Sequence, residues 1–208
     1  MFTGLVQDSG CIKDITELQG GRIFAVEVHF DTEKIKKGDS IAINGACQSV
    51  IKKENNTLYF EAMNETLRLT NLASIKKGDF VNVELAMKLS DRLDGHLVSG
   101  HIDRVAKLNS IKNDGVARIF NFECDTDLIV KKGSISVNGI SLTVSEVNEK
   151  NFEVSILPET FNNTNLKYLK INDVVNIEYD MVAKYIKKFT EQKKESRITK
   201  EFLIENGF

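Results

Sequence analysis

Histidine is scarce in this sequence, and two of its three histidines lie close together. His96 and His101 are five residues apart in the segment DGHLVSGHID, among glycine and serine residues. Imidazole titrates near neutral pH, so one of them could transfer a proton in a reaction. The alternative is a histidine that makes a structural hydrogen bond beside a glycine turn. The sequence leaves both interpretations open.

Cys47 and Ser141 occupy matching positions in two similar segments, NGACQS and NGISLT. A nucleophilic Cys47 would need a nearby base or cation to form the thiolate, and the alternative is a small buried apolar residue. Hydroxyl side chains also recur in matching pairs, namely Ser40 and Ser134, Ser49 and Thr143, and Thr66 and Thr160. Such repeated polar groups suit a pocket for a small polar heterocycle or polyol, and they are equally typical of caps and turns.

Composition excludes several classes of function. The 28 basic and 30 acidic residues give a net charge of −2, which argues against nucleic acid as a partner. No apolar run is long enough to span a membrane, and the start, MFTGLVQDSG, lacks the features of a signal peptide. The three cysteines are widely spaced and belong to no metal-binding motif, so we expect a reducing, cytoplasmic setting without a disulfide or a metal site. P-loop, dinucleotide and GxSxG motifs are also missing, and nothing in the sequence indicates a cofactor.

The chain contains a duplication. The segments SIAINGACQSV, ETLRLTNL and GDFVNVE are each followed 94 residues later by a counterpart, SISVNGISLTV, ETFNNTNL and NDVVNIE. Residues 40–84 and 134–178 are identical at 15 of 45 aligned positions. Nearer the start of each copy, TGLV from Thr3 matches SGHI from Ser99. We therefore predict two similar units at residues 1–94 and 95–180, with a tail at residues 181–208.

Each unit reads as a small β domain. Short alternating or β-branched runs such as NTLYFEAM and NFEVSIL predict strands, and Asn-Gly at 44–45 and 138–139 predicts tight turns. This pattern favours a small antiparallel barrel or sandwich. Each copy also has one predicted short helix, at residues 66–75 and 160–169, with Thr66 and Thr160 as possible N-caps.

The tail, residues 181–208, has a helical pattern instead of the alternating pattern of the two units. Tyr185, Ile186 and Phe189 lie at positions i, i+1 and i+4 among lysine and glutamate residues, a pattern typical of an amphipathic helix. Residues 198–208 predict a further helical turn. The apolar stripe must be buried against the barrels of the same chain or against a neighbouring chain.

The segments MFTGLV, NGACQSV, NETLRLTNL, DGHLVSGHI, NGISLTV and LPETFNNTNL together closely resemble the riboflavin synthase family, alpha-chain type, over the whole chain. The resemblance implies an all-β fold of two similar six-stranded antiparallel Greek-key barrels in tandem plus a C-terminal helix. Three such chains associate largely through that helix, and lumazine synthase is a possible further partner.

The reaction implied by the resemblance takes two molecules of 6,7-dimethyl-8-ribityllumazine and transfers a four-carbon unit from one to the other. The products are riboflavin and 5-amino-6-(D-ribitylamino)uracil, and neither an external cofactor nor a metal takes part. Each barrel holds one lumazine, and the catalytic pair forms where the N-terminal barrel of one chain faces the C-terminal barrel of the next.

Site residues can be carried over from the family position by position. The first pocket is expected to use Gly4, Leu5, Val6, Cys47, Gln48, Ser49, Glu61, Ala62, Met63, Asn64, Glu65 and Thr66. The second is expected to use Gly100, His101, Ile102, Lys132, Ser141, Leu142, Thr143, Ser155, Ile156, Leu157, Pro158, Glu159 and Thr160. Residues at positions tied to activity in the family are Phe2, Thr3, Ser40, Cys47 and His101.

One departure from the family pattern concerns the first pocket. The family has Leu-Thr where this chain has Gln48 and Ser49, so the hydroxyl is kept but the leucine is lost. Two other functions are alternatives for this sequence. Non-catalytic antenna proteins of luminous bacteria share the fold, but they tend to replace the residues that correspond to Thr3 and His101, which this chain keeps. A flavin-reductase-type barrel would need a nicotinamide-binding domain downstream of the barrel.

Overall fold

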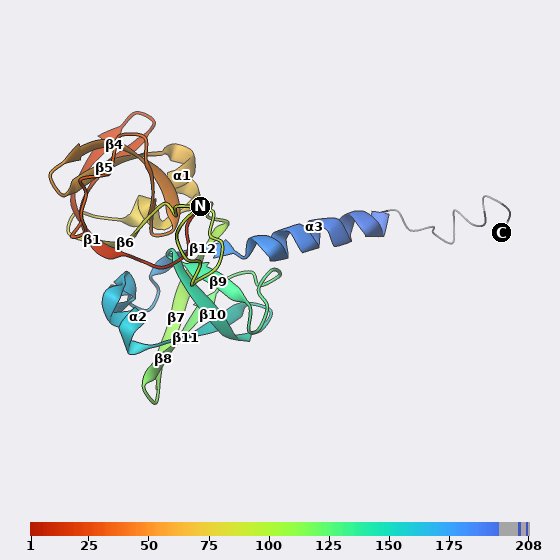
Figure 1. Cartoon of the computed structure of the whole chain (residues 1–208). Coiled ribbons are helices and arrows are strands. Elements are labelled where there is room, and N and C mark those ends of the chain that lie inside the picture. The colour runs from red at the N-terminus through yellow and green to blue at the C-terminus, as the bar shows by residue number, and fades with distance from the viewer. Residues whose placement is uncertain (196–203, 205–206, 208) are drawn as a thin grey trace.

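The computed structural model describes residues 1–195, 204 and 207. They form two closed six-stranded antiparallel barrels followed by a helix, as the resemblance predicts (Figure 1). Most of the turn predicted at residues 198–208 lies outside the described residues.

Barrel 1 contains strands β1 to β6, in the order β1-β2-β5-β4-β3-β6 around the barrel. Their bounds are β1 (Asp8–Leu18), β2 (Gly21–Glu27), β3 (Ser40–Ile43), β4 (Ala46–Glu54), β5 (Thr57–Met63) and β6 (Phe80–Leu85). Barrel 2 repeats this order with β7 (Arg104–Asp114), β8 (Ala117–Glu123), β9 (Ser134–Val137), β10 (Ile140–Val147), β11 (Asn151–Ile156) and β12 (Val174–Tyr179). Strands β3, β4 and β5 are consecutive neighbours, and β6 returns to lie beside β3, which is the Greek-key arrangement.

The strands form because apolar residues alternate along them, so that one face of each strand lines a barrel interior. In β5, Leu58, Phe60 and Ala62 are fully buried and the residues between them are not. The Asn-Gly pairs form the β3–β4 and β9–β10 turns, with positive φ at both residues as a tight hairpin requires. The turn prediction is thus confirmed.

The predicted helices begin earlier than expected. Helix α1 (Asn64–Leu69) is followed by a separate 3-10 turn, η1 (Asn71–Ser74), and α2 (Pro158–Asn163) is followed by η2 (Asn165–Tyr168). Thr66 therefore lies inside α1 and Thr160 inside α2, so both N-cap predictions are wrong. The capping hydroxyls belong to the next threonines, since Thr70 accepts from the amide of Leu72 and Thr164 from the amide of Leu166.

A cluster of buried asparagines joins the two barrels. It consists of three repeat-equivalent pairs, Asn44 and Asn138, Asn71 and Asn165, and Asn82 and Asn176. The amide of Asn71 donates to Oδ1 of Asn176 at 2.6 Å, and the matching bond from Asn165 to Asn82 measures 2.7 Å. Because buried amides tolerate few alternative pairings, this cluster fixes how one barrel sits on the other.

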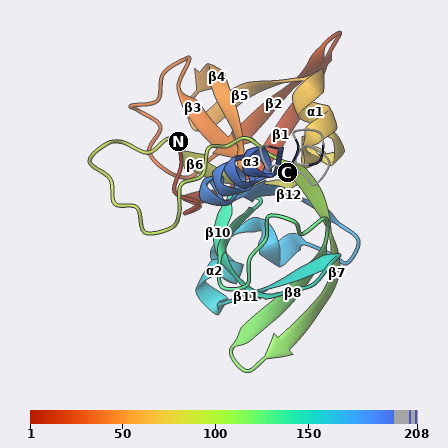
Figure 2. The ribbon, with the colours of Figure 1, turned by 90° about the vertical axis from the view of Figure 1, so that its right-hand side faces the viewer.

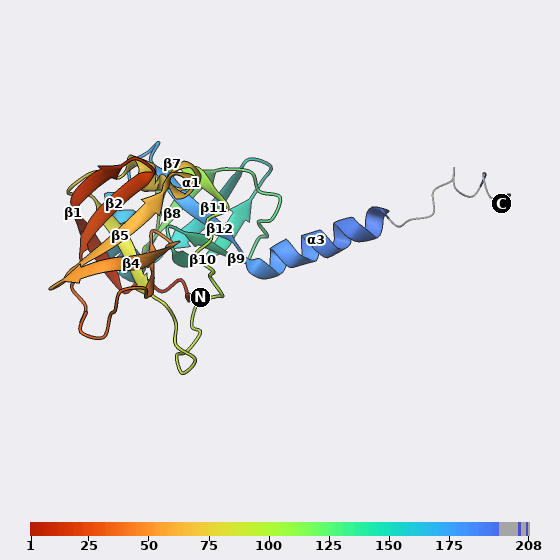
Figure 3. The ribbon, with the colours of Figure 1, turned by 90° about the horizontal axis from the view of Figure 1, so that it is seen from above.

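Helix α3 (Met181–Glu195) follows barrel 2 and extends away from both barrels (Figures 1 and 3). Viewed along its length, it starts near the junction between the two barrels (Figure 2). Val182, Tyr185, Ile186 and Phe189 are 57–62 % exposed, so the apolar stripe predicted from the sequence has no cover within the described chain. Among the helices of the described residues, none is both long and apolar enough to cross a membrane.

Candidate active site

The beginnings of the two repeats cross over, and each contacts the barrel of the other repeat. The amide of Ser141, on β10 in barrel 2, donates to the carbonyl oxygen of Gly4 at 2.8 Å. In the matching contact, the amide of Cys47, on β4 in barrel 1, donates to the carbonyl oxygen of Gly100 at 2.8 Å. Two equivalent sites arise in this way, and each is built from both repeats.

Side-chain packing follows the same crossing. Val6 packs against the core of barrel 2, and Ile102 packs against the core of barrel 1. The sequence-based grouping of the pockets is therefore wrong in one respect, because residues 4–6 lie with Ser141 and residues 100–102 lie with Cys47. A repeat identifies equivalent segments, but it does not reveal whether they pair within a copy or between copies.

Phe2 lies where the two crossing segments meet. It forms an antiparallel bridge with its repeat equivalent Val98, with amide-to-carbonyl distances of 2.7 and 3.1 Å. The Phe2 side chain is fully buried against Ala42 and Val98, and it lies close enough to Gly100 to exclude a Cβ there. Phe2 therefore supports the site by packing, out of reach of a ligand.

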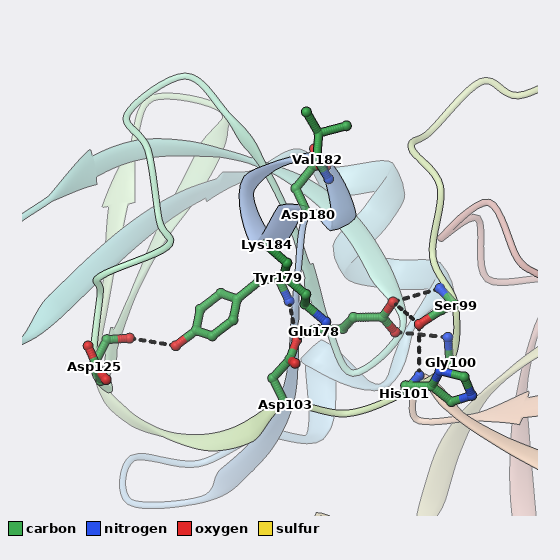
Figure 4. A network of polar contacts seen from close by, with 10 residues as sticks. All are labelled: Ser99, Gly100, His101, Asp103, Asp125, Glu178, Tyr179, Asp180, Val182 and Lys184. Carbon is green, nitrogen blue, oxygen red and sulfur yellow. Dashed lines mark hydrogen bonds and ion pairs between the residues drawn. The ribbon is translucent and has the colours of Figure 1, made fainter. Parts of the chain in front are cut away.

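Two buried glutamates hold the crossing segments. Glu178, on β12, accepts hydrogen bonds from the amide of Ser99 at 2.6 Å, its hydroxyl at 2.7 Å and the amide of Gly100 at 2.9 Å (Figure 4). The Ser99 hydroxyl in turn accepts from the amide of His101 at 3.2 Å. The carboxylate thus fixes the segment that leads to Cys47.

Glu84, on β6, does the same for the other crossing segment. It accepts from the amide and hydroxyl of Thr3, both at 2.7 Å, and from the amide of Gly4 at 3.1 Å. Burial raises the pKa of Glu84 above its ordinary value, and the hydrogen bonds from Thr3 and Gly4 oppose that rise. The Thr3 hydroxyl donates its proton to this carboxylate and so does not donate to a ligand. Both glutamates were missed at the sequence level, although the matching endings VNVE and VNIE carried the signal.

The site on barrel 1 encloses a cavity of about 220 Å³. Its lining joins four predicted residues of the first repeat, Cys47, Gln48, Glu65 and Thr66, to the crossing segment, Gly100, His101 and Ile102. Cys47 is a free thiol, and His101 is exposed. The side-chain amide of Gln48 donates to the carbonyl oxygen of Cys47 at 2.7 Å. The glutamine that stands here in place of the family's leucine is therefore hydrogen-bonded to its own strand.

Other predicted residues lie outside this cavity. Ser40 and Ser49 pair across β3 and β4, but neither lines the cavity. Ala62 and its repeat equivalent Ile156 are fully buried in the two cores, which leaves only their main chains for a ligand. Lys132 lies in the loop before β9, where its amide donates to the carbonyl oxygen of Val144 at 2.8 Å.

A single methyl group should disrupt the site on barrel 1. Gly100 has a φ of +83°, and an added Cβ would lie 2.6 Å from Cβ of Cys47. We expect Gly100→Ala to lower the free energy of unfolding by about 1–3 kcal/mol more than a substitution that introduces backbone strain alone. Gly78→Ala is the matched control, because Gly78 has a φ of +92° with nothing within 4 Å of the new Cβ. Chemical denaturation of both variants measures the difference, and equal losses would contradict the close contact.

The described residues contain no cluster of three or more histidine, cysteine or acidic side chains that could hold a metal ion. Cys11, Cys47 and Cys124 are all free thiols.

Comparisons with known proteins match the duplicated architecture of the chain. The family described as the lumazine binding domain matches the chain twice, at residues 3–86 and 99–180. The chain is 36 % identical over 215 residues to riboflavin synthase of Bacillus subtilis (strain 168), with 100 % of both chains covered. It is 41 % identical over 186 residues to riboflavin synthase of Escherichia coli (strain K12), with 86 % of this chain and 87 % of that one covered.

Among solved structures, LumP complexed with riboflavin has a TM-score of 0.78 at 24 % identity, covering 86 % of this chain and 99 % of LumP. LumP complexed with 6,7-dimethyl-8-(1'-D-ribityl) lumazine has a TM-score of 0.77 at 23 % identity, covering 86 % and 98 %. At this level of identity, the likeness to LumP supports the fold alone.

Proposed function

The chain belongs to the riboflavin synthase family, and from this membership we propose that it converts two molecules of 6,7-dimethyl-8-ribityllumazine into riboflavin and 5-amino-6-(D-ribitylamino)uracil. The observation that carries the proposal is the pair of repeat-equivalent crossing sites in one chain. A reaction between two identical molecules needs two similar sites, and a duplicated fold supplies them.

The sites suit such a reaction chemically. One lumazine must lose a proton from its C7 methyl group, and the other must be attacked at a ring carbon before its four-carbon unit is transferred. Holding two molecules in a fixed mutual orientation can contribute roughly 7–11 kcal/mol to catalysis. We propose that the residues carried over from the family bind one lumazine at each site, with residues 100–102 assigned to barrel 1 and residues 4–6 to barrel 2.

We further propose that the active assembly is a homotrimer in which barrel 1 of one chain faces barrel 2 of the next. Helix α3 and the loop at residues 127–134 border a groove of about 610 Å³, into which Ile186 and Val182 face. An apolar groove beside an uncovered apolar helix suits contact with a second copy of the chain. The same membership makes lumazine synthase a protein to test for co-sedimentation, and the free thiols agree with a cytoplasmic location.

The direct test measures turnover without an added metal or reductant. The purified chain is incubated with 6,7-dimethyl-8-ribityllumazine in buffer that contains a chelator and no reductant, and riboflavin is followed by its absorbance. Riboflavin and the pyrimidine should form in equal amounts. A protein that binds lumazine without forming riboflavin would act as an antenna protein instead, and turnover that required a nicotinamide would indicate a reductase.

The two sites should prove chemically unequal, because one lumazine must give up a proton and the other must accept attack. Cys47 and His101 both border the barrel-1 cavity. We expect Cys47→Ser and His101→Gln each to lower kcat while riboflavin affinity stays within about tenfold, a change of roughly 1.4 kcal/mol or less.

The effect of His101→Gln on kcat should be the larger one if the imidazole moves a proton in the reaction. Steady-state rates across pH and equilibrium titrations on the same preparations decide the matter. Equal losses in rate and affinity, with an unchanged pH profile, would mean that both residues only pack or orient.

A further inference from the structure

A buried histidine outside the predicted site residues contacts the site on barrel 2. His96 lies in the connection between the barrels and is 9 % exposed. Its Nδ1 atom is 2.7 Å from Oγ of Ser141. Its amide donates to the carbonyl oxygen of Thr3 at 3.2 Å, next to the Gly4 carbonyl that pairs with Ser141. His96 therefore contacts both segments that form this site, the N-terminal segment at Thr3 and strand β10 at Ser141.

Burial determines the charge of His96. Burial lowers the pKa of the imidazole below its ordinary value, while the negative charges of Glu178 and Asp180 act in the opposite direction and do not cancel the effect. The imidazole is thus neutral at neutral pH. Within the part of the chain that the structure describes, Nε2 of His96 is buried and has no hydrogen-bond partner, so the contact with Ser141 is the ring's one side-chain hydrogen bond.

The matching position on barrel 1 has different chemistry. There, Cys47 takes the place of Ser141, and a thiol is a weak donor and a weak acceptor. The nearby His101 is exposed, in contrast with the enclosed His96. The two sites thus share their backbone architecture and differ in the group that a ligand meets.

We propose that His96 is a positioning residue, whose neutral imidazole fixes the direction of the Ser141 hydroxyl and so distinguishes the lumazine site on barrel 2 from the one on barrel 1. A neutral imidazole can accept the Ser141 proton at Nδ1, which leaves the hydroxyl lone pairs for the ligand. A protonated imidazole is a donor at both nitrogens and forces the hydroxyl to turn round. The proposal rests on the proposed function, because it assumes that Ser141 faces bound lumazine.

The test compares two side chains that can replace parts of the imidazole. The amide of asparagine reaches the position of Nδ1, whereas leucine keeps an apolar filling without a hydrogen bond. We expect His96→Leu to lower kcat about tenfold, the loss typical of one hydrogen bond, and His96→Asn to recover most of it. Ser141→Ala should match His96→Leu, and the double variant should be no worse than either single variant.

Acid pH supplies a second readout. Because burial lowers the pKa of His96, the activity that depends on its neutral form should be present at neutral pH and lost only as the pH falls well below the ordinary imidazole value of about 6.5. This acid limb should be absent in His96→Asn. It should persist in His29→Asn, which alters an exposed histidine that pairs with Asp8. The proposal would be overturned if the losses of kcat in His96→Leu and Ser141→Ala multiplied in the double variant. It would also be overturned if the fall in activity at acid pH persisted in His96→Asn.

Riboflavin binding keeps the test separate from turnover. The wild-type protein, His96→Leu, Ser141→Ala and the double variant are titrated with riboflavin at pH 7.5 and pH 5.5. The coupling between His96 and Ser141 is then measured from binding alone, without turnover. If the wild-type protein forms no riboflavin, the proposed function fails. If it forms riboflavin but binding in the variants shows no coupling, the role of His96 fails alone.

Discussion

The Glu178→Gln variant is expected to lose about 100-fold in turnover, the penalty that a displacement of about 1 Å can impose on a reacting pair. Both oxygens of Glu178 accept hydrogen bonds from the segment at Ser99 and Gly100. A glutamine would place an NH₂ group against one of these donors, so a buried amide or hydroxyl loses its partner. The free energy of unfolding should fall by about 1–3 kcal/mol, too little to unfold a domain of ordinary stability.

The crossing makes this prediction specific to one site. Glu178 belongs to barrel 2, yet the segment it holds completes the site on barrel 1, where Cys47 bonds to Gly100. In a background that carries Cys11→Ser and Cys124→Ser, Glu178→Gln should therefore speed alkylation of Cys47. Glu84→Gln should leave the Cys47 rate unchanged, although it too should lower turnover, because Glu84 holds the segment that meets Ser141.

The control for a general effect of losing a carboxylate is Glu146→Gln. Glu146 is an exposed residue of β10 that pairs with Lys131, and such surface pairs contribute little to stability. Its turnover and Cys47 reactivity should match those of the wild-type protein. Faster alkylation of Cys47 in Glu84→Gln, with no change in Glu178→Gln, would mean that the segments do not cross in solution.

Much of the fold could be predicted from the sequence because the signals are local. Alternation along runs such as NTLYFEAM predicts which face of each strand is buried, and Asn-Gly predicts where chains turn. The duplication then predicts two similar units, and the family resemblance predicts that each is a barrel. The helix starts were misplaced because a threonine hydroxyl is a strong N-cap signal, whereas α1 and α2 begin without a side-chain cap. The threonines that do cap, Thr70 and Thr164, stand before the 3-10 turns that follow these helices.

The crossing could not be predicted in this way. In a duplicated chain, pairing of residues 4–6 with their own copy and with the other copy satisfies the same local pattern. Asn82 and Glu84 illustrate the difficulty, since alternation with Val81 and Val83 places them on the outer face of β6 and suggests contact with water. Both are nearly fully buried, because the other barrel and the N-terminal segment cover that face. The pattern of a single strand cannot distinguish solvent from a second domain.

Removal of helix α3 should dissociate the assembly and greatly lower turnover. A protein that ends at Asp180 keeps both barrel cores, and it loses exposed apolar residues together with two ion pairs, Lys184 to Asp103 and Lys187 to Asp127. Pairs of this kind typically contribute about 1 kcal/mol or less, so the barrels should stay folded. We expect the truncated protein to sediment as a monomer and to turn over at least about 100-fold more slowly, because two lumazines are no longer held together.

A smaller change tests the same surface without shortening the chain. Phe189→Asp places a charge on the apolar stripe of α3, whereas Lys188→Asp places one on an exposed position next to it. Only Phe189→Asp should dissociate the assembly, and higher protein concentration should restore its activity because association is a mass-action equilibrium. Riboflavin affinity should change little in either variant, since each site is built from the two repeats of a single chain. If the truncated protein and Phe189→Asp both remain trimeric and fully active, the surface that joins the chains must lie on the barrels themselves.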